Sequence, residues 1–202
     1  MVSEVERDMR YFALRKKRVR QYDSEFLAFT NADTGMFVLE IGCGTGIFSR
    51  YLQQKGFTNV VCLDLDERLA SVLSDLDPFQ VVFEDAEAYL DSISGKQTFD
   101  LIVMQDVLEH LPLEKTLSMF RAFYSALAPS GRVLIRTPNL SSPWGARLFY
   151  GGFDHVTPYS PDRVREIAAL TNFQVVRMAG QKTGKRRKQI AANILHGILS
   201  RI

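Results

Sequence analysis

The sequence predicts an α/β fold in which a doubly wound, mostly parallel sheet carries helices on both faces. Short segments rich in Val, Ile and Leu alternate along the chain with segments of helical periodicity, which is typical of a buried parallel sheet. A strand, a glycine-rich turn and a helix also follow one another at residues 38–52, "VLEIGCGTGIFSRYL". In such a fold a turn of this kind lies at the carboxyl end of a strand, where ligands bind.

The composition is that of a soluble globular protein. The chain has 202 residues, enough for one domain with a full core, and 46% of them are apolar. A formal net charge of +2 does not indicate a nucleic-acid binder. Cys43 and Cys62 lie in apolar segments without metal-ligand spacing, which predicts reduced thiols in a cytoplasmic protein. We expect neither a signal peptide nor a transmembrane helix, because no apolar run approaches ~18 residues.

The predicted elements follow the apolar periodicity and the residues that interrupt it. A helix over residues 4–30 has an apolar face of Tyr11, Phe12, Leu14, Val19, Tyr22, Phe26, Leu27 and Phe29. Strands are predicted at residues 36–42, 59–66, 79–86, 99–106, 132–139 and 173–180. Further helices are predicted at residues 46–55, 67–75, 114–127 and 161–170. Gly56 ends the first of these helices, Pro78 follows the second, and Ser160 is the expected N-cap of the last.

The glycine-rich turn has the spacing G-x-G-x-G, at Gly42, Gly44 and Gly46. Glycines there let backbone N–H groups approach a ligand, and the helix that follows adds its partial positive charge. A pyrophosphate-binding loop usually has the spacing G-x-G-x-x-G instead. Glu40 lies two residues before the first glycine, where a carboxylate suits a cationic or amino-bearing ligand. The alternative is a turn that only packs a helix on a strand.

Polar side chains follow three further strands of the predicted sheet. Asp64 ends the second strand, where a carboxylate can accept hydrogen bonds from ribose hydroxyls. The third strand ends in Glu84, Asp85 and Ala86, and the fourth ends in Gln105 and Asp106. Each residue alone is consistent with a solvated turn. Together with the glycine turn they line one rim of the sheet, which predicts a nucleoside-binding cleft.

Five segments carry a resemblance to a known family: "VLEIGCGTG", "CLDLDE", "FEDAE", "FDLIVMQDVLEHL" and "LAPSGRVLIRTPN". In order and spacing, residues 36–178 resemble the class I S-adenosylmethionine-dependent methyltransferases, which have a Rossmann-like fold. The resemblance is to the branch of small-molecule, glycan and ubiquinone-biosynthesis type O-methyltransferases. It implies a seven-stranded sheet of order 3-2-1-4-5-7-6 with a reversed last strand. It also implies S-adenosylmethionine as the methyl donor and S-adenosylhomocysteine as the product.

The resemblance further implies which residues contact the donor: Glu40, Gly42, Cys43, Gly44, Gly46, Asp64, Leu65, Asp85, Ala86 and Gln105. Glu40 would lie near the ammonium group of the donor, and Asp64 would hold the ribose hydroxyls. Leu65 would flank the adenine ring, Asp85 would meet its amino group, and Gln105 would lie beside the sulfonium.

The acceptor is expected to be an oxygen atom of a small molecule, a sugar or a lipid-linked intermediate. Methyltransferases of exocyclic base amines usually carry [DN]-P-P-[YFW] after the fourth strand, and here that position reads "MQDVLEH". Neither cysteine is placed to attack a pyrimidine ring, so methylation of nucleic-acid bases is disfavoured. Two alternatives stay open. One is an RNA-directed methyltransferase that uses the basic helix at residues 15–20, and the other is a non-catalytic, donor-binding partner subunit.

The segment "DVLEHL" contains Asp106, Glu109 and His110. It resembles the "EVLEH" of ubiquinone-biosynthesis type O-methyltransferases, in which acidic residues and a histidine have been proposed to hold a divalent metal. We expect no metal here, and we expect Glu109 and His110 to organise the loop instead. Asp106 and His110 are nevertheless candidate catalytic residues.

A long irregular segment, residues 137–160, is predicted to cover the open rim as an acceptor lid. It contains His155 and the aromatic residues Trp144, Phe149, Tyr150, Phe153 and Tyr159. An imidazole in such a lid is a candidate general base for an alcohol or phenol. The alternative role of His155 is to hydrogen-bond the backbone and fix the lid. The aromatic side chains either pack together or stack on a sugar or an aromatic ring.

The predicted organisation is a helical cap at residues 1–30, a methyltransferase domain at 31–181, and a basic and amphipathic segment at 182–202. In the last segment a basic run, "KTGKRRK", precedes Ile190, Ile194, Ile198 and Ile202, whose four-residue spacing predicts a helix. Alternatively, residues 188–194 form part of a final strand. The helix would contact an anionic membrane surface or a partner chain. We expect a monomer or a homodimer.

Overall fold

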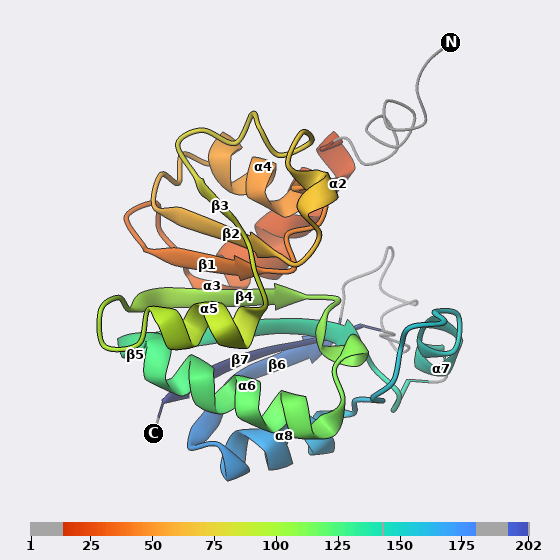
Figure 1. Cartoon of the computed structure of the whole chain (residues 1–202). Helices are drawn as coiled ribbons and strands as arrows, with labels where there is room; N and C mark the ends of the chain where they lie inside the picture. Colours follow the sequence, from red (N-terminus) through yellow and green to blue (C-terminus); the bar gives the residue numbers. More distant parts are fainter. Residues whose placement is uncertain (1–13, 143, 181–193, 202) are drawn as a thin grey trace. The chain divides into compact units, whose positions relative to one another are not determined.

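The computed structural model describes residues 14–142, 144–180 and 194–201. Its seven-stranded sheet has the order β3-β2-β1-β4-β5-β7-β6, which confirms the predicted order (Figure 1). The strands are β1 (Val38–Ile41), β2 (Val60–Asp64), β3 (Gln80–Phe83), β4 (Phe99–Gln105), β5 (Leu127–Pro138), β6 (Phe173–Gly180) and β7 (Ile194–Arg201). The chain divides into two compact units, residues 1–86 and 87–202.

In the first unit the strands β1, β2 and β3 are parallel neighbours. Every residue of β1 is buried, as the apolar run predicts for a strand covered on both faces. Helix α4 (Ile47–Gln54) follows the glycine turn and buries Phe48, Tyr51 and Leu52. The connection from β1 to β2 is therefore the helical crossover that parallel strands need.

The predicted helix at residues 67–75 is wrong for most of its length. Only a 3₁₀ turn, η2 (Glu67–Leu69), forms there, capped by the Asp66 side chain, which accepts from the backbone N–H of Arg68. Turns follow it, and the Ser74 hydroxyl donates to the Ser71 carbonyl. Serine and aspartate side chains compete for backbone groups in this way and so oppose a continued helix.

From residue 14 onward, where the structure describes it, the N-terminal helix consists of three pieces, α2 (Lys16–Tyr22), the π-helical η1 (Asp23–Leu27) and α3 (Ala28–Thr30). Its apolar face packs on α4, where the rings of Tyr22 and Phe26 lie edge-on to the ring of Phe48, at centroid distances of 5.1 and 4.9 Å. The predicted apolar face is thus confirmed there, whereas Tyr11 and Phe12 lie outside the described residues.

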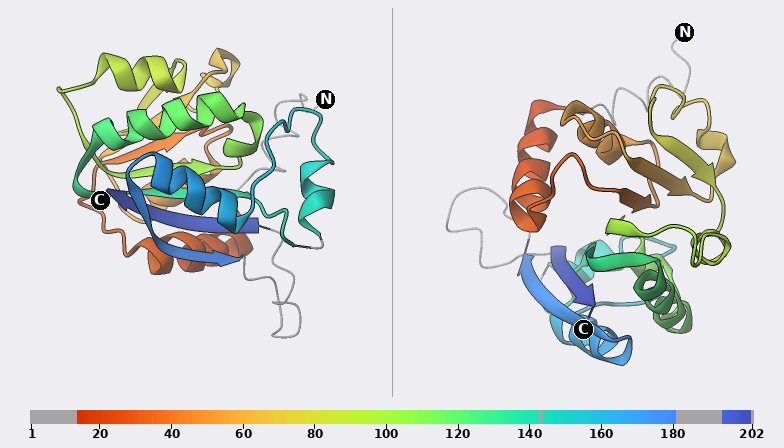
Figure 2. Two further views of the ribbon diagram at one scale, coloured as in Figure 1. Left: turned by 90° about the horizontal axis from the view of Figure 1, so that it is seen from below. Right: turned by 90° about the vertical axis from the view of Figure 1, so that its left-hand side faces the viewer.

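In the second unit β5 is parallel to β4 and antiparallel to β7, and β7 is antiparallel to β6. Helices α6 (Leu113–Ala126) and α8 (Pro161–Leu170) lie on the same side of β6 and β7 (Figure 2). The Ser160 hydroxyl accepts from the N–H of Arg163, which confirms the predicted N-cap. Three short helices were not predicted: α5 (Ala86–Ser92), η3 (Leu108–His110) and α7 (Gly145–Phe149).

The predicted C-terminal helix is wrong over residues 194–201, which form β7 between β5 and β6. Leu195, His196, Ile198 and Leu199 are all buried, so both faces of this strand are covered. A four-residue spacing equals two strand periods, so the isoleucine pattern fits a strand as well as a helix. The helical surface that we expected to contact a membrane or partner is therefore not formed there, and the basic run lies outside the described residues. Among the described residues, no helix is long and apolar enough to span a membrane.

Candidate active site

The three glycines after β1 all adopt positive φ angles, of 72° at Gly42, 53° at Gly44 and 73° at Gly46. A Cβ atom on Gly46 would lie 2.7 Å from the Leu73 side chain and 2.8 Å from that of Arg50. A Cβ atom on Gly44 would meet nothing within 4 Å. A side chain at Gly46 would therefore have to displace the ends of the Leu73 and Arg50 side chains, whereas Gly44 turns towards open space that a ligand can occupy.

Glu40 lies at the centre of β1 with only 5% of its surface exposed. The Ser49 hydroxyl of α4 donates to its Oε2 at 2.6 Å. Burial raises the pKa of Glu40 to about 8, and the Asp64 carboxylate adds to the shift. Glu40 therefore holds a proton at neutral pH in the ligand-free protein, and a cationic group bound beside it would favour its ionised form. Ser49 was not predicted as a site residue. A serine on the buried face of an amphipathic helix nevertheless indicates a buried hydrogen-bond partner and could have been recognised in the sequence.

Asp64 ties the glycine turn to the end of β2. Its Oδ2 accepts from the Gly44 N–H at 2.7 Å, and its Oδ1 accepts from the Asp66 N–H at 3.0 Å. A carboxylate can accept about four hydrogen bonds, so Asp64 retains capacity for hydroxyl donors. The next side chain, Leu65, is 73% exposed, which leaves an apolar surface where an adenine ring was predicted. Asp85 and Ala86 lie in the turn after β3 and at the start of α5.

Both cysteines are buried. Burial raises the pKa of the Cys43 thiol far above its usual range and that of Cys62 to about 12, so neither thiol is a nucleophile at neutral pH. This agrees with the expectation that neither attacks a pyrimidine ring. Cys43 instead contributes its backbone to the turn, where its N–H donates to the Leu63 carbonyl at 3.1 Å.

In the second unit β4 ends at Gln105, whose Nε2 is buried and makes no hydrogen bond to the described residues. A buried amide donor of this kind costs stability unless a ligand or water completes it. Asp106 follows in the left-handed region, with φ 55°, and forms an ion pair with Arg136 of β5, whose Nε lies 3.0 Å from Oδ1. The carboxylate of Asp106 is therefore already balanced by a guanidinium.

The predicted lid folds back onto η3. The N–H groups of Val156 and Thr157 donate to the Glu109 carbonyl at 2.8 and 3.1 Å, and the Thr157 hydroxyl donates to the Leu111 carbonyl at 2.6 Å. Helix α7 lies beyond the carboxyl ends of β4 and β5 (Figure 1). The end of the lid is thus attached to the loop that carries Glu109 and His110.

These hydrogen bonds bring together Glu109, His110 and His155, which are 46 residues apart in the chain at most. The rings of His110 and His155 are edge-to-face with their centroids 4.7 Å apart. Glu109 is 2% exposed, and its Oε2 accepts from the Thr137 hydroxyl at 3.0 Å. Burial raises the pKa of the Glu109 carboxyl.

The two imidazoles are held through the same nitrogen. Nδ1 of His155 lies 2.7 Å from the Phe149 carbonyl oxygen, and Nδ1 of His110 lies 3.2 Å from both the carbonyl and the carboxylate oxygen of Asp154. Carbonyl and carboxylate oxygens only accept, so in each ring Nδ1 carries the proton. In the neutral tautomer Nε2 then presents its lone pair. The backbone-fixing role foreseen for His155 is present, and it leaves the opposite nitrogen for chemistry.

The lid aromatics divide into two groups. Phe149 and Tyr159 are buried, and the Tyr159 hydroxyl shares a 2.7 Å hydrogen bond with that of Thr116, so these two rings have packing roles. Trp144, Tyr150 and Phe153 are exposed, at 58%, 78% and 110%. Only the exposed group is available to contact an acceptor.

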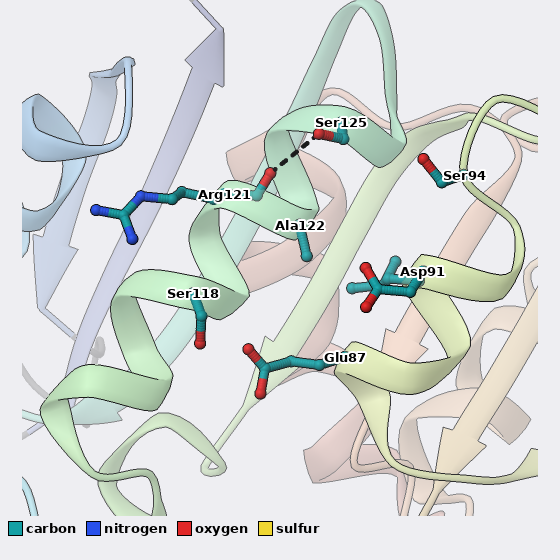
Figure 3. Close-up of a pocket in the computed structure, with 8 residues that line it drawn as sticks. Glu87, Asp91, Ser94, Ser118, Arg121, Ala122 and Ser125 are labelled. Atoms are coloured by element: carbon teal, nitrogen blue, oxygen red, sulfur yellow. Dashed lines mark hydrogen bonds between the residues drawn. The ribbon is translucent and has the colours of Figure 1, made fainter.

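A separate hollow of about 340 Å³ lies between α5 and α6 (Figure 3). Its lining includes Glu87, Asp91 and Ser118, and the guanidinium of Arg121 points away from α5. It contains none of the predicted site residues.

Comparisons with known proteins agree with this geometry. A family model described as a methyltransferase domain matches residues 11–178, so the chain belongs to this methyltransferase family. The ubiquinone biosynthesis O-methyltransferase of Leptothrix cholodnii is 30% identical over 138 residues, covering 66% of this chain and 57% of that protein. Phosphoethanolamine N-methyltransferase 3 of Arabidopsis thaliana is 31% identical over 130 residues, covering 59% of this chain and 25% of that protein. The chain thus spans little more than half, or a quarter, of the length of these curated relatives.

Solved structures share the fold. A SAM-dependent methyltransferase from Archaeoglobus fulgidus superposes with a TM-score of 0.75 at 21% identity, covering 92% of each chain. Magnesium protoporphyrin IX methyltransferase from Synechocystis, solved with bound SAH, has a TM-score of 0.67 at 18% identity, covering all of this chain and 89% of that one. The expected fold and membership of the class I S-adenosylmethionine-dependent methyltransferases are confirmed. S-adenosylmethionine is the cofactor of this class.

Proposed function

We propose that the protein methylates a hydroxyl oxygen of a small molecule, a sugar or a lipid-linked intermediate. The carrying observation is the pair of imidazoles at His110 and His155, each held through Nδ1 so that Nε2 presents a lone pair. A hydroxyl must lose its proton when its oxygen is methylated, and a fixed imidazole beside a lid is a suitable proton acceptor. The exposed lid aromatics Trp144, Tyr150 and Phe153 offer an apolar surface for the rest of the acceptor.

The donor-side residues of the first unit fit S-adenosylmethionine in three respects. The open space at Gly44 admits a ligand against the backbone, the buried Glu40 carboxylate suits an ammonium group, and Asp64 can accept from ribose hydroxyls. When bound, this cofactor supplies an activated methyl group: the carbon–sulfur bond breaks, sulfur keeps the electron pair, and a carbon–oxygen bond forms. The protein aligns the acceptor oxygen and receives its proton. The buried amide of Gln105 is a further donor for a ligand.

The relatives support methylation of oxygen, and they also suggest the main alternative, which is methylation of nitrogen. One of them is named for O-methylation in ubiquinone biosynthesis, and another is named for N-methylation of phosphoethanolamine. Any assay of hydroxyl acceptors should therefore also include amine acceptors for comparison.

The test is turnover of purified protein with S-adenosylmethionine and five acceptor sets: phenols and catechols, sugars, lipid-linked phenols, RNA, and amines including phosphoethanolamine. S-adenosylhomocysteine release gives the rate, and mass spectrometry locates the methyl group. We expect a methyl ether, and we expect His155→Ala to lower kcat by about 100-fold. The exposed Asp162, which forms an ion pair with its neighbour Arg165, provides the matched control Asp162→Asn.

An N-methyl product would overturn the oxygen assignment. Transfer to RNA alone would favour the RNA-directed alternative. Binding of S-adenosylhomocysteine without turnover on any acceptor set would favour the non-catalytic partner subunit.

A further inference from the structure

Glu40 is a buried acid whose titratable neighbours are also acids. Only 5% of its surface is exposed, and it lies in register with Cys62 of the adjacent parallel strand β2. It interacts with the Asp64 carboxylate at the end of that strand and with the thiols of Cys62 and Cys43. An ionised Glu40 would therefore lie next to another carboxylate, away from water.

The cations of helix α4, which follows the glycine turn, are engaged elsewhere. The Arg50 guanidinium is paired with Asp75 and the Lys55 ammonium with Asp23, each at 2.6 Å. Among the described residues, no cation contributes to the pKa of Glu40. A negative charge on this side chain would have no counter-ion in the ligand-free protein, and a buried charge without a partner is costly.

The Ser49 hydroxyl of α4 fixes one oxygen of this carboxyl group. It donates to Oε2 of Glu40 at 2.6 Å, and Ser49 itself is fully buried. The second oxygen, Oε1, can accept further hydrogen bonds. The hydroxyl favours the ionised form of Glu40, but burial outweighs it and raises the pKa to about 8.

Asp64 connects Glu40 with the open space at Gly44. Its carboxylate interacts electrostatically with Glu40, and its Oδ2 accepts from the Gly44 N–H at 2.7 Å. A Cβ atom on Gly44 would meet nothing within 4 Å, so a ligand can approach the backbone there. Such a ligand meets two coupled carboxyl groups, and both would attract a positive charge that it carries.

We propose that Glu40 and Ser49 form a receptor for the ammonium group of the methyl donor, and that filling this receptor releases one proton. Ser49 is a positioning residue, because it orients the carboxyl group through Oε2. The ammonium supplies the positive charge that Glu40 lacks. The carboxyl O–H bond then breaks, its electron pair stays on the oxygen, and the proton passes to solvent water. This inference rests on the donor side of the proposed function and is independent of the acceptor.

Proton release makes donor affinity depend on pH. At pH 7 a carboxyl group with a pKa of about 8 is protonated in about nine molecules of ten, so binding should release close to one proton. Affinity should rise by up to about tenfold per pH unit from pH 6 and level off above pH 8. The amino group of the ligand titrates as well, and the variant Glu40→Gln, which has no such proton to lose, shows that contribution by itself.

The experiment is calorimetric titration of the full chain with S-adenosylhomocysteine at pH 7, in phosphate and in Tris. The two buffers have different ionisation enthalpies, so the difference in heat counts the protons released. We expect about one proton for the wild type and for the control Asp162→Asn, and none for Glu40→Gln. A second ligand, 5′-methylthioadenosine, lacks the amino-acid part and should bind the wild type without releasing a proton.

The role of Ser49 is tested by the pH profile of affinity. Ser49→Ala removes the hydroxyl that favours the ionised carboxyl group, so the rise of affinity should move to higher pH. We expect binding at pH 7 to be about tenfold weaker in this variant. A purely structural role would weaken binding equally at every pH and would overturn the assignment of Ser49.

Two results would overturn the proton-linked receptor: saturable binding of S-adenosylhomocysteine without proton release, or equal release by wild type and Glu40→Gln. Should Glu40→Gln fail to fold, equal release with S-adenosylhomocysteine and 5′-methylthioadenosine would overturn it instead. The failure of the proposed function is distinguishable. Proton release without methyl ether formation would refute only the oxygen acceptor, whereas absence of S-adenosylhomocysteine binding would refute the donor site and this inference together.

Discussion

The glycine turn after β1 and the cluster of Glu109, His110 and His155 are built in different ways. The turn after β1 depends on residues that are close in sequence or on adjacent parallel strands, such as Gly44, Ser49 and Asp64 around Glu40. The cluster depends on hydrogen bonds between η3 and a lid segment more than forty residues further along the chain, such as that from Val156 to Glu109. The conformation of the turn is determined by its glycine backbone and by a buried carboxyl group. The cluster is determined by hydrogen bonds between loops that are far apart in the sequence. The two regions should therefore respond differently to substitution and to pH.

The first expected effect is on donor affinity. Asp64→Ala removes the acceptor of the Gly44 N–H and the predicted partner of the ribose hydroxyls. We expect about a 100-fold weaker binding of S-adenosylhomocysteine, equivalent to about 2.7 kcal/mol. Calorimetric titration measures it, with Asp162→Asn as the control. An unchanged dissociation constant in Asp64→Ala would contradict our assignment of the turn as the donor site.

The second effect concerns Glu40 and alkaline pH. Burial raises the pKa of Glu40 from 4.5 to about 8, so the folded protein keeps a proton that the unfolded chain loses. This contribution to stability is complete below pH 4.5 and is lost as pH rises towards 8, at up to about 1.4 kcal/mol per pH unit. Glu40→Gln should abolish this slope in chemical unfolding of the ligand-free protein. Parallel pH profiles for wild type and Glu40→Gln would show that the residue is not buried as described.

The third effect concerns His196 in the second unit. Here stability falls as the pH is lowered, whereas the Glu40 contribution falls as the pH is raised. Burial and the Arg136 guanidinium lower the pKa of His196 to about 4, while Asp106 acts in the other direction. The folded protein therefore holds neutral His196 while the unfolded chain binds a proton below pH 6.5. Stability is complete above that pH and is lost towards pH 4, by a total of about 2 to 3 kcal/mol.

His196→Leu, which cannot titrate, should remove this acid-side loss and leave the alkaline slope of Glu40 intact. Unfolding free energies between pH 4 and pH 7 give the measurement. If the variant kept the acid-side slope of the wild type, another group would have to be responsible.

The smallest effect is a difference in stability between alanine substitutions at two nearby glycines, Gly44 and Gly46. Gly44→Ala adds a methyl group in open space and costs about 1 kcal/mol for its left-handed backbone. Gly46→Ala has the same backbone cost and also presses on Leu73 and Arg50, so we expect about 2 kcal/mol. Thermal unfolding ranks the two variants. Gly44→Ala should nevertheless weaken S-adenosylhomocysteine binding, and equal losses of stability would remove the distinction between packing and ligand space.

Much of the fold could be predicted because local patterns and tertiary structure agree. The apolar run at β1, the positive-φ glycines after it and the Ser160 cap are short-range features, and each is found where it was expected. The turns at residues 70–75 and the strand β7 were mispredicted because their local patterns were ambiguous. Serines and aspartates there satisfy backbone groups outside a helix, and a four-residue isoleucine spacing suits both periods.

The sequence by itself determined the turn after β1: the glycine spacing, Glu40 and the acidic strand end at Asp64 are all local to the β-α-β framework. Tertiary structure alone decided the contacts of the lid and of the loop after β4. It paired Asp106 with Arg136, packed Tyr159 against Thr116 and brought His155 to His110. The physical reason is that parallel strand ends place nearby residues at one rim whatever the connecting loops do. The partners within a long loop depend instead on which distant backbone groups satisfy one another's hydrogen bonds.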